Sequence, residues 1–271
     1  MRKSIQDIYW YYLKGLRKYE KFLNKYQGYG SRNILDFKRR NSLQWKTIDK
    51  ILSNLLIFDG LQVRAHLRSM YEKNKQLFDD PKTYITHLGP VGKSGALILN
   101  QFLRCFPIKY YQVIPFTMIN ELSHNSNIIF LDDFIGTGNQ AIEYIRTING
   151  LINSSTKPYL FTIAATEKGV KKINLFSPKF KVQPSVLLDD KRFFLLGSDS
   201  NILDDEEKKV IKSLNAKLHI TDQSEFHLGI PVAFYYSTPD NTLGILWNDK
   251  NKYKDETNTE REWYGLIPRE Y

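Results

Sequence analysis

The chain has little of what would build a disulfide scaffold, a zinc site or a membrane anchor. Cys105 is the single cysteine among 271 residues, so neither an internal disulfide nor a cysteine-rich zinc site can form. No apolar run approaches the roughly 18 residues of a membrane-spanning helix. Lys14, Arg17 and Lys18 interrupt the start of the chain, where a secretory signal needs an apolar stretch. These absences favour a soluble, cytoplasmic protein with no membrane partner.

The residues that are present indicate a folded chain with a sizeable core. Hydrophobic residues make up 42% and charged residues 25%, which excludes an intrinsically disordered protein. The 17 Tyr and 16 Phe side chains supply large apolar surfaces for burial. A length of 271 residues corresponds to one large domain or two small ones.

Positive charge is concentrated in the first third of the chain. Residues 1–80 hold 17 of the 39 Lys and Arg residues but 8 of the 29 Asp and Glu residues, so most of the net charge of +10 lies there. One interpretation is an acidic partner such as nucleic acid, with Lys38, Arg39 and Arg40 as candidate contacts. The other is a solvated basic surface without a dedicated partner. No zinc finger, helix-turn-helix or RNA-binding aromatic motif accompanies the charge.

The pattern of apolar residues divides the chain into three regions. Residues 1–80 show mainly helical spacing, with helices expected over 4–26, 43–57 and 61–78 around a polar connector at 32–41. Residues 81–190 alternate apolar runs with helical patterns, which predicts an α/β core with a parallel sheet between helices. Residues 191–271 are less regular. Strands are expected at 84–88, 110–116, 128–131, 159–164, 231–236 and 242–247.

The strongest chemical signal is a buried strand followed by two carboxylates and a glycine-containing turn. The segment reads Ile128-Ile129-Phe130-Leu131-Asp132-Asp133-Phe134-Ile135-Gly136-Thr137-Gly138-Asn139-Gln140. N–H groups at the start of the following helix favour an anion, and the Thr137 hydroxyl can donate to a phosphate oxygen. Asp132 and Asp133 can accept hydrogen bonds from sugar hydroxyls and help hold Mg²⁺, directly or through water. The segment therefore predicts a phosphorylated-sugar site, and its alternative is an ordinary connection whose carboxylates cap the helix.

A second turn of this kind lies upstream, again between a strand and a helix. It contains Gly92, Lys93, Ser94 and Gly95, which offer backbone donors, one cation and one hydroxyl to a second phosphate group. A nucleotide-hydrolysing P-loop also combines Gly-Lys-Ser with a later Asp-Asp. That motif requires a glycine five residues before the glycine of the triplet, and His87 occupies this position. The spacing therefore favours the sugar-phosphate interpretation over a P-loop hydrolase.

The first segment resembles the phosphoribosyl-pyrophosphate motif of the type I phosphoribosyltransferases. Asp132, Asp133, Thr137 and Gly138 match it, whereas Gln140 stands where that family usually has a second hydroxyl. The resemblance implies that Asp132 and Asp133 hold the ribose, the turn 134–140 its 5′-phosphate, and the turn 92–95 the pyrophosphate with Mg²⁺. The segment 109–127 would correspond to the flexible catalytic loop of the family. Its candidate residues are Lys109, Tyr110 and Tyr111.

The C-terminal segment adds a finer resemblance. Pro239-Asp240-Asn241-Thr242-Leu243 with Trp247, followed by Trp263 and Pro268-Arg269, is similar to the tail of a phosphoribosyltransferase-like group associated with bacterial conflict and antiviral systems, including retron effectors. This implies a C-terminal hood over residues 191–271, pentosyl transfer by a glycosyltransferase that acts as an effector or toxin, and a nucleic-acid or reverse-transcriptase partner. The alternative is a binding module that keeps the ribose-phosphate pocket without turnover.

Overall fold

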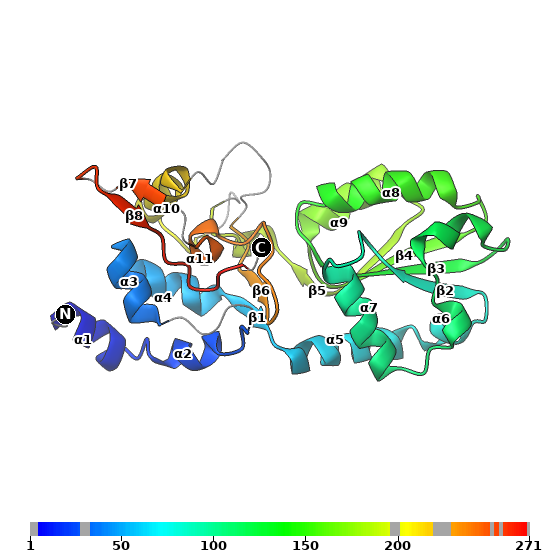
Figure 1. Cartoon of the computed structure of the whole chain (residues 1–271), viewed down its shortest axis with the longest axis horizontal. Coiled ribbons are helices and arrows are strands. Elements are labelled where there is room, and N and C mark those ends of the chain that lie inside the picture. Colours follow the sequence, from blue (N-terminus) through cyan, green and yellow to red (C-terminus); the bar gives the residue numbers. More distant parts are fainter. Residues whose placement is uncertain are drawn as a thin grey trace. The chain divides into compact units, whose positions relative to one another are not determined.

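The computed structural model describes residues 5–27, 33–195, 201–218, 229–249, 252–254 and 257–269 (Figure 1). The chain forms two compact units: Leu61–Asp189, and Met1–Gly60 together with Asp190–Tyr271. The boundary at Asp189–Asp190 lies within one residue of the expected boundary at 190. The first boundary lies at Gly60–Leu61 and not at 80, so residues 61–80 join the α/β core, and the two ends of the chain share one unit. None of the described helices is long and apolar enough to cross a membrane.

The α/β unit is built on a parallel sheet, as the sequence predicts. Its hydrogen-bonded order is β2 (Thr83–His87), β3 (Asn127–Ile135), β4 (Lys157–Thr166) and β5 (Lys181–Leu188). A parallel bridge between Ile85 and Val113 continues the sheet on the far side of β2. Val113 follows β2 in the chain, yet β3 adds to the opposite side of β2. The direction of strand addition therefore reverses between β2 and β3, and open α/β sheets bind ligands at the carboxyl ends of the strands at such a switch point.

Helices cover both faces of this sheet (Figure 1). On one face, α5 (Gly60–Lys73) and α7 (Ser94–Cys105) enclose an aromatic cluster with the sheet, and the short helix α6 (Lys75–Asp79) contributes to it. The cluster consists of Tyr71, Phe78, Phe102, Phe106 and Phe161. On the other face, α8 (Asn139–Leu151) and α9 (Glu167–Phe176) pack with the sheet around a core that includes Phe130, Ile145 and Ile173. These two apolar layers fix the strand ends that carry the predicted site residues.

Several strands in this unit differ in extent from those that the sequence predicts. β3 does not stop before the carboxylates but continues through Asp132 and Asp133 to Ile135, paired with β4. The strand expected at 110–116 is instead a pair of 3₁₀ helices, Tyr110–Gln112 and Phe116–Glu121, with one bridging residue between them. The sequence does not predict β5, because residues 181–188 contain Pro184 and show only a weak alternation of apolar and polar side chains. As the end strand of this sheet, β5 tolerates the proline.

The other unit joins the two ends of the chain through one apolar core. Its elements are α1 (Ile5–Ile8), a π-helix (Tyr9–Leu13), α2 (Lys18–Leu23), α3 (Ile34–Asn41), α4 (Trp45–Asn54), β1 (Leu56–Phe58), a 3₁₀ helix (Asp190–Arg192), α10 (Asp205–Lys217), β6 (Val232–Phe234), α11 (Gly244–Trp247), β7 (Lys252–Lys254) and β8 (Glu260–Glu262). β1 and β6 pair in parallel, which ties the N-terminal half of the unit to its C-terminal half.

Three sequence expectations for this unit are wrong. The helix expected over 4–26 is interrupted near Gly15, whose φ of +73° is a conformation that glycine adopts readily. The polar connector at 32–41 contains helix α3, which the Asn33 side chain caps by accepting from the N–H groups of Leu35 and Asp36. The strand expected at 242–247 is the short helix α11.

Candidate functional site

The two predicted turns meet at the switch point of the sheet. One connects β2 to α7, and the other connects β3 to α8. The Ser94 hydroxyl, at the first residue of α7, donates to Oδ1 of Asp132 on β3 over 3.3 Å. At the residue just after β2, the Leu88 N–H donates over 3.0 Å to the carbonyl of Leu131, which precedes Asp132 in β3. Two segments that lie almost forty residues apart in the sequence therefore form one site.

The two carboxylates lie at different depths in this site. Asp133 is 8% exposed and Asp132 is half-buried. Burial raises the pKa of Asp132 well above its ordinary value, and the neighbouring Asp133 carboxylate raises it further. Oδ1 of Asp132 accepts from the Asp133 N–H over 2.9 Å. Within the described part of the chain, Asp132 forms no ion pair, so the site can use sugar hydroxyls or a cation to stabilise its negative charge.

The donor set fits Mg²⁺ as a partial set of ligands. Among the residues that the structure describes, no group of three or more His, Cys, Asp or Glu side chains could enclose a metal ion. Mg²⁺ commonly keeps several waters and takes one or two carboxylates together with substrate phosphates. Asp132 and Asp133 are two adjacent carboxyl groups at a strand end, which suits that arrangement. A metal here would need water and a phosphorylated ligand to complete its coordination.

The turn after β3 is held in place by the start of α9. Thr166 Oγ1 donates to the Gly136 carbonyl over 2.6 Å. Gly138 has a φ of +82°, and a Cβ there would lie 2.9 Å from the Gly169 carbonyl oxygen, so a side chain would strain the turn and displace its neighbour. Gly138 is also the N-cap of α8 and supplies no side-chain cap, so the first N–H groups of α8 can receive an anion.

The side chains of this turn differ in exposure. Thr137 is 4% exposed and its hydroxyl accepts from the Asn139 N–H over 3.4 Å. Gln140 is exposed, and Asn139 is half-buried. Phe134 is half-buried and Ile135 is buried in the core with α8 and α9. Of the side chains of this turn, Gln140 is thus open to solvent and Thr137 is enclosed.

The turn after β2 is more open. Gly92 and Lys93 are exposed, Ser94 is half-buried and Gly95 is buried. Lys93 is the N-cap of α7 and its side chain does not cap the helix. A Cβ on Gly95 would lie 3.0 Å from the Leu131 carbonyl oxygen, so glycine permits the close approach of α7 to β3. The start of α7 thus presents backbone donors and a cation at the same edge as Asp132.

Two groups of candidate residues lie elsewhere. Lys109, Tyr110 and Tyr111 precede Gln112, whose amide donates to the carbonyls of Phe78, Asp80 and Thr83. Those carbonyls lie at the amino end of β2, whereas the site lies at the carboxyl ends of the strands. Residues 109–111 therefore lie beside the amino end of β2, and their role as candidates in a catalytic loop stays a prediction.

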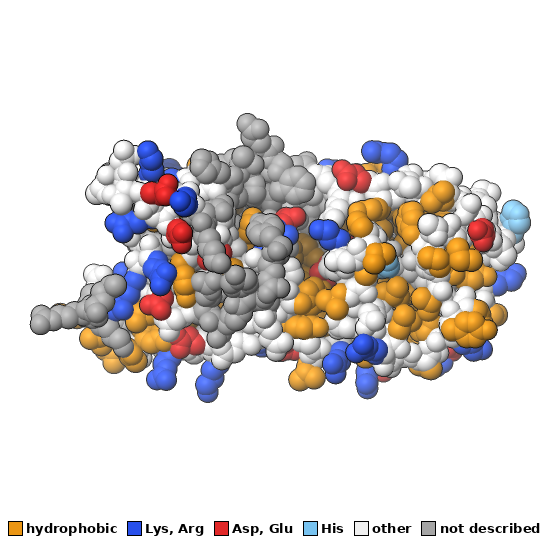
Figure 2. Space-filling model, in the orientation of Figure 1, with side chains coloured by type: hydrophobic (Ala, Val, Ile, Leu, Met, Phe, Trp, Pro, Cys, Tyr) orange, Lys and Arg blue, Asp and Glu red, His pale blue; other side chains and the backbone are white. Residues whose placement is uncertain are grey.

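The basic run at 38–40 belongs to the other unit and has partners there. Lys38 Nζ and Arg39 Nε lie 3.7 and 3.3 Å from the carboxylate of Asp7. The Arg40 guanidinium lies 4.8 Å from the centre of the Tyr264 ring. On the face shown in Figure 2, Lys and Arg side chains are dispersed and do not form one continuous patch.

Three residues around the site were missed from the sequence. Thr162 is the β4 partner of Asp132 in the parallel register, so both side chains point to the same face, and its buried hydroxyl has no hydrogen-bond partner among the described residues. Thr166 anchors the Gly136 carbonyl, as above. Lys172 Nζ donates to Asn139 Oδ1 over 2.6 Å. Strand register and tertiary packing create these contacts, and no local sequence pattern indicates them.

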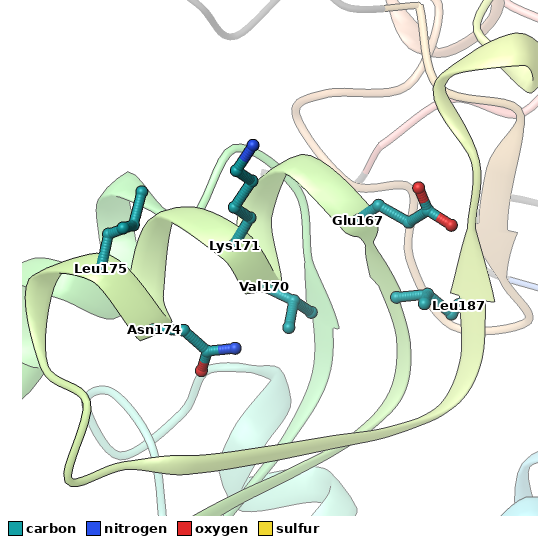
Figure 3. A pocket seen from close by; sticks show the side chains of 6 residues that line it. All are labelled: Glu167, Val170, Lys171, Asn174, Leu175 and Leu187. Atoms are coloured by element: carbon teal, nitrogen blue, oxygen red, sulfur yellow. The ribbon is translucent and has the colours of Figure 1, made fainter.

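A recess elsewhere in the α/β unit does not involve the predicted residues. It lies between α9 and β5 and is mostly apolar (Figure 3). The residues that line it are Glu167, Val170, Lys171, Asn174, Leu175 and Leu187. The site at the switch point is thus defined by strand ends and helix starts, separate from this recess.

The structure is that of a doubly wound α/β protein, and its candidate site lies at the carboxyl edge of a parallel sheet. Residues 30–269 match the profile of the PRTase-CE family. The chain therefore belongs to the PRTase-CE family, and this confirms the phosphoribosyltransferase-like resemblance. No curated protein matches the chain.

Solved structures of phosphoribosyltransferases also match the chain. The adenine phosphoribosyl transferase of Trypanosoma brucei, in complex with AMP, pyrophosphate and ribose-5-phosphate, is 15% identical, with a TM-score of 0.35 over 55% of this chain and 76% of that chain. The purine phosphoribosyltransferase of Pyrococcus horikoshii is 13% identical, with a TM-score of 0.32 over 49% of this chain and 85% of that chain.

Proposed function

We propose that the chain binds phosphoribosyl pyrophosphate or a related ribose phosphate, together with Mg²⁺, at the switch point between β2 and β3. We further propose that it transfers the ribose phosphate group as a glycosyltransferase. The observation that carries the proposal is the hydrogen bond from Ser94 to Asp132. It joins the two turns that the sequence predicts to bind two different phosphate groups of one ligand.

Each part of the ligand has a matching group in this site. The carboxylates of Asp132 and Asp133 accept hydrogen bonds from the ribose hydroxyls. The first turn of α8, with the Thr137 hydroxyl, receives the 5′-phosphate, because free N–H groups and the helix dipole favour an anion. The first turn of α7, with Lys93, receives the pyrophosphate. When bound, Mg²⁺ supplies positive charge that neutralises the pyrophosphate as it leaves.

The proposed reaction exchanges one bond at C1 of the ribose. The bond from C1 to the pyrophosphate oxygen breaks, and its electron pair leaves with pyrophosphate. A nucleophile forms the new bond to C1 and gives up its proton to the departing pyrophosphate or to water. Positive charge grows on the sugar ring during this exchange, and the carboxylates of Asp132 and Asp133 can stabilise it. The site contributes mainly by holding the two reactants in position.

A second function, binding without turnover, is favoured by the placement of residues 109–111. These residues lie at the amino end of β2 and not in the site. Among the described residues of the site, no side chain is thus assigned to take the proton from a nucleophile. In this second proposal, the ribose phosphate acts as a signal that the chain binds.

One experiment separates these functions. Phosphoribosyl pyrophosphate and Mg²⁺ are titrated into the purified chain by calorimetry, and pyrophosphate release is followed with and without nucleobases or nucleic acid. The Asp132→Asn variant is expected to lose binding, whereas Glu143→Gln, which removes an exposed charge from α8, keeps it. Release supports the transferase, and binding without release supports the module. If the unaltered chain does not bind, the proposed site is refuted.

The biological role that we propose is an effector in an antiviral defence system such as a retron, with nucleic acid or a reverse-transcriptase complex as partner. The resemblance of the 239–269 segment and the net charge of +10 support this role. Cells carrying the chain with its neighbouring genes are challenged with phage, in parallel with cells carrying Asp132→Asn. Protection that is lost in the variant agrees with the proposal, and protection that persists contradicts it.

A further inference from the structure

We propose that Lys172 is the cation that binds the 5′-phosphate, and that it selects ligands carrying a phosphate ester at this end of the pentose. This inference rests on the proposed function and deepens it. Lys172 Nζ lies 2.6 Å from Oδ1 of Asn139, the first residue of α8. The lysine is half-buried and reaches the turn from α9.

The packing of α9 against residues 136–140, which we call the phosphate turn, holds Lys172 in this position. The Thr166 hydroxyl accepts from the Gly169 N–H over 2.9 Å and donates to the Gly136 carbonyl over 2.6 Å. A Cβ on Gly169 would overlap the Gly136 carbonyl oxygen, so glycine permits the helix to contact the turn directly. Lys172 follows Gly169 by three residues, about one helical turn. Its side chain therefore extends from a helix that is fixed to the turn by backbone contacts.

The turn itself supplies only neutral donors. A phosphate monoester carries about −1.5 to −2 charges at pH 7. Thr137 and the N–H groups of α8 are uncharged, Gln140 is exposed, and the nearby Asp132 and Asp133 are acidic. An ammonium group has three N–H donors and can serve more than one acceptor. Lys172 can therefore hold Asn139 and a phosphate oxygen together, and it supplies the positive charge that the turn lacks.

The neighbouring lysine provides a matched control. Lys171 and Lys172 lie on the same helix and carry the same charge. Lys171 is exposed and lines the recess between α9 and β5 (Figure 3), whereas Lys172 contacts the phosphate turn. If a loss of ligand affinity depends only on the net charge of α9, it will appear when either Lys171 or Lys172 is replaced by a neutral residue. A loss that depends on contact with the 5′-phosphate will appear only at Lys172.

The test measures three ligands against four proteins by calorimetry with Mg²⁺ present. The ligands are phosphoribosyl pyrophosphate, ribose 5-phosphate and pyrophosphate; the proteins are the unaltered chain, Lys172→Met, Lys172→Arg and Lys171→Met. Lys172→Met is expected to weaken the two 5′-phosphorylated ligands by about 10- to 100-fold, because it removes a charge-assisted hydrogen bond. Its affinity for pyrophosphate is expected to stay unchanged. Lys172→Arg should recover part of the loss, and Lys171→Met should match the unaltered chain.

The outcomes separate this inference from the proposed function. If the unaltered chain binds none of the three ligands, the proposed function fails and Lys172 has no such role. If it binds them and Lys172→Met binds equally well, the inference alone fails. Equal losses for pyrophosphate and ribose 5-phosphate in Lys172→Met, or equal losses in Lys171→Met, also overturn it, because the effect would then be structural or a general effect of charge.

Discussion

Two acidic side chains, buried Asp7 and half-buried Asp132, lie in different units, and their surroundings distinguish a structural role from the proposed binding role. Asp7 lies within reach of Lys38 and Arg39 and accepts from the indole N–H of Trp45 over 3.2 Å. Asp132 has a hydroxyl, a backbone N–H and a second acid as neighbours. The chain neutralises the first carboxylate itself, whereas the second lies at a strand end where a ligand can do so.

The largest effect is expected from removing both charges at the site. Asp132→Asn combined with Asp133→Asn should reduce affinity for phosphoribosyl pyrophosphate by at least about 100-fold, because two or more hydrogen bonds to charged groups are lost. The fold should remain, since amides replace the carboxyl groups without a change in size. Calorimetry and circular dichroism measure the two quantities. Unchanged affinity in a folded double variant would show that these acids do not bind the ligand.

At Asp7 the expected effect is on stability instead of binding. Asp7→Ala should lower the free energy of unfolding by about 2–3 kcal/mol, somewhat less than for a fully buried pair, because the side chains of Lys38 and Arg39 are 24% and 20% exposed. Urea denaturation measures the loss. Affinity for ribose 5-phosphate serves as the control and should not change. If Asp7→Ala is as stable as the unaltered chain, Asp7 has no structural role and does not differ from Asp132 in that way.

The contact between α9 and the phosphate turn gives the next effect. Gly169→Ala places a Cβ against the Gly136 carbonyl oxygen, which must move. A destabilisation of about 1–3 kcal/mol is expected, as for other overpacked positions, together with weaker binding of ribose 5-phosphate. Gly150→Ala is the control, because a Cβ on Gly150 meets nothing within 4 Å. If Gly169→Ala and Gly150→Ala bind ribose 5-phosphate equally well, the position of the phosphate turn does not affect ligand binding.

The raised pKa of Asp132 predicts a smaller effect that depends on pH. In the unfolded chain this carboxyl loses its proton near its ordinary value of 3.8, whereas in the folded chain it holds the proton to higher pH. Ionisation therefore costs stability as the pH rises from 3.8 through the raised pKa. Asp132→Asn cannot ionise, so it should be more stable than the unaltered chain at pH 7, and the gain should vanish as the pH falls towards 3.8. A variant that is less stable at pH 7 would refute this assignment.

The smallest effect is expected at Lys38. Lys38→Gln should change the free energy of unfolding by at most about 1 kcal/mol, because the lysine is partly exposed and Arg39 still contacts Asp7. If the basic run also contacts nucleic acid, this variant should bind more weakly and with a flatter dependence on salt concentration. Nucleic-acid affinity that does not respond to Lys38→Gln at any salt concentration argues against this contact.

The sequence predicts the centre of the sheet and its turns well, for a local reason. The run Ile128–Leu131 is continuously apolar, which is typical of a strand buried on both faces, and the glycines after it mark the turn. The meeting of Ser94 with Asp132 follows from the parallel alternation of strands and helices, which brings the carboxyl ends of neighbouring strands together.

The remaining contacts depend on partners that are distant in sequence. The sequence indicates an exposed basic run at Lys38 and Arg39, because no pattern in the neighbouring sequence shows that Asp7 neutralises them. Thr162 lies within an apolar strand and becomes relevant only through its register with Asp132. Lys172 is one lysine among several on α9, and only the fold brings it to Asn139. Such pairings are set by tertiary packing, which local patterns do not encode.

Hydrogen–deuterium exchange with phosphoribosyl pyrophosphate and Mg²⁺ is the most direct measurement of the central claim. Backbone N–H groups at the starts of α7 and α8 bind the two phosphate groups in this account. Exchange should therefore slow together in residues 92–95 and 136–141, and should not slow in Asp132→Asn. Slowed exchange at saturating ligand in only one of these turns, or only outside both, would contradict a single ligand bridging them.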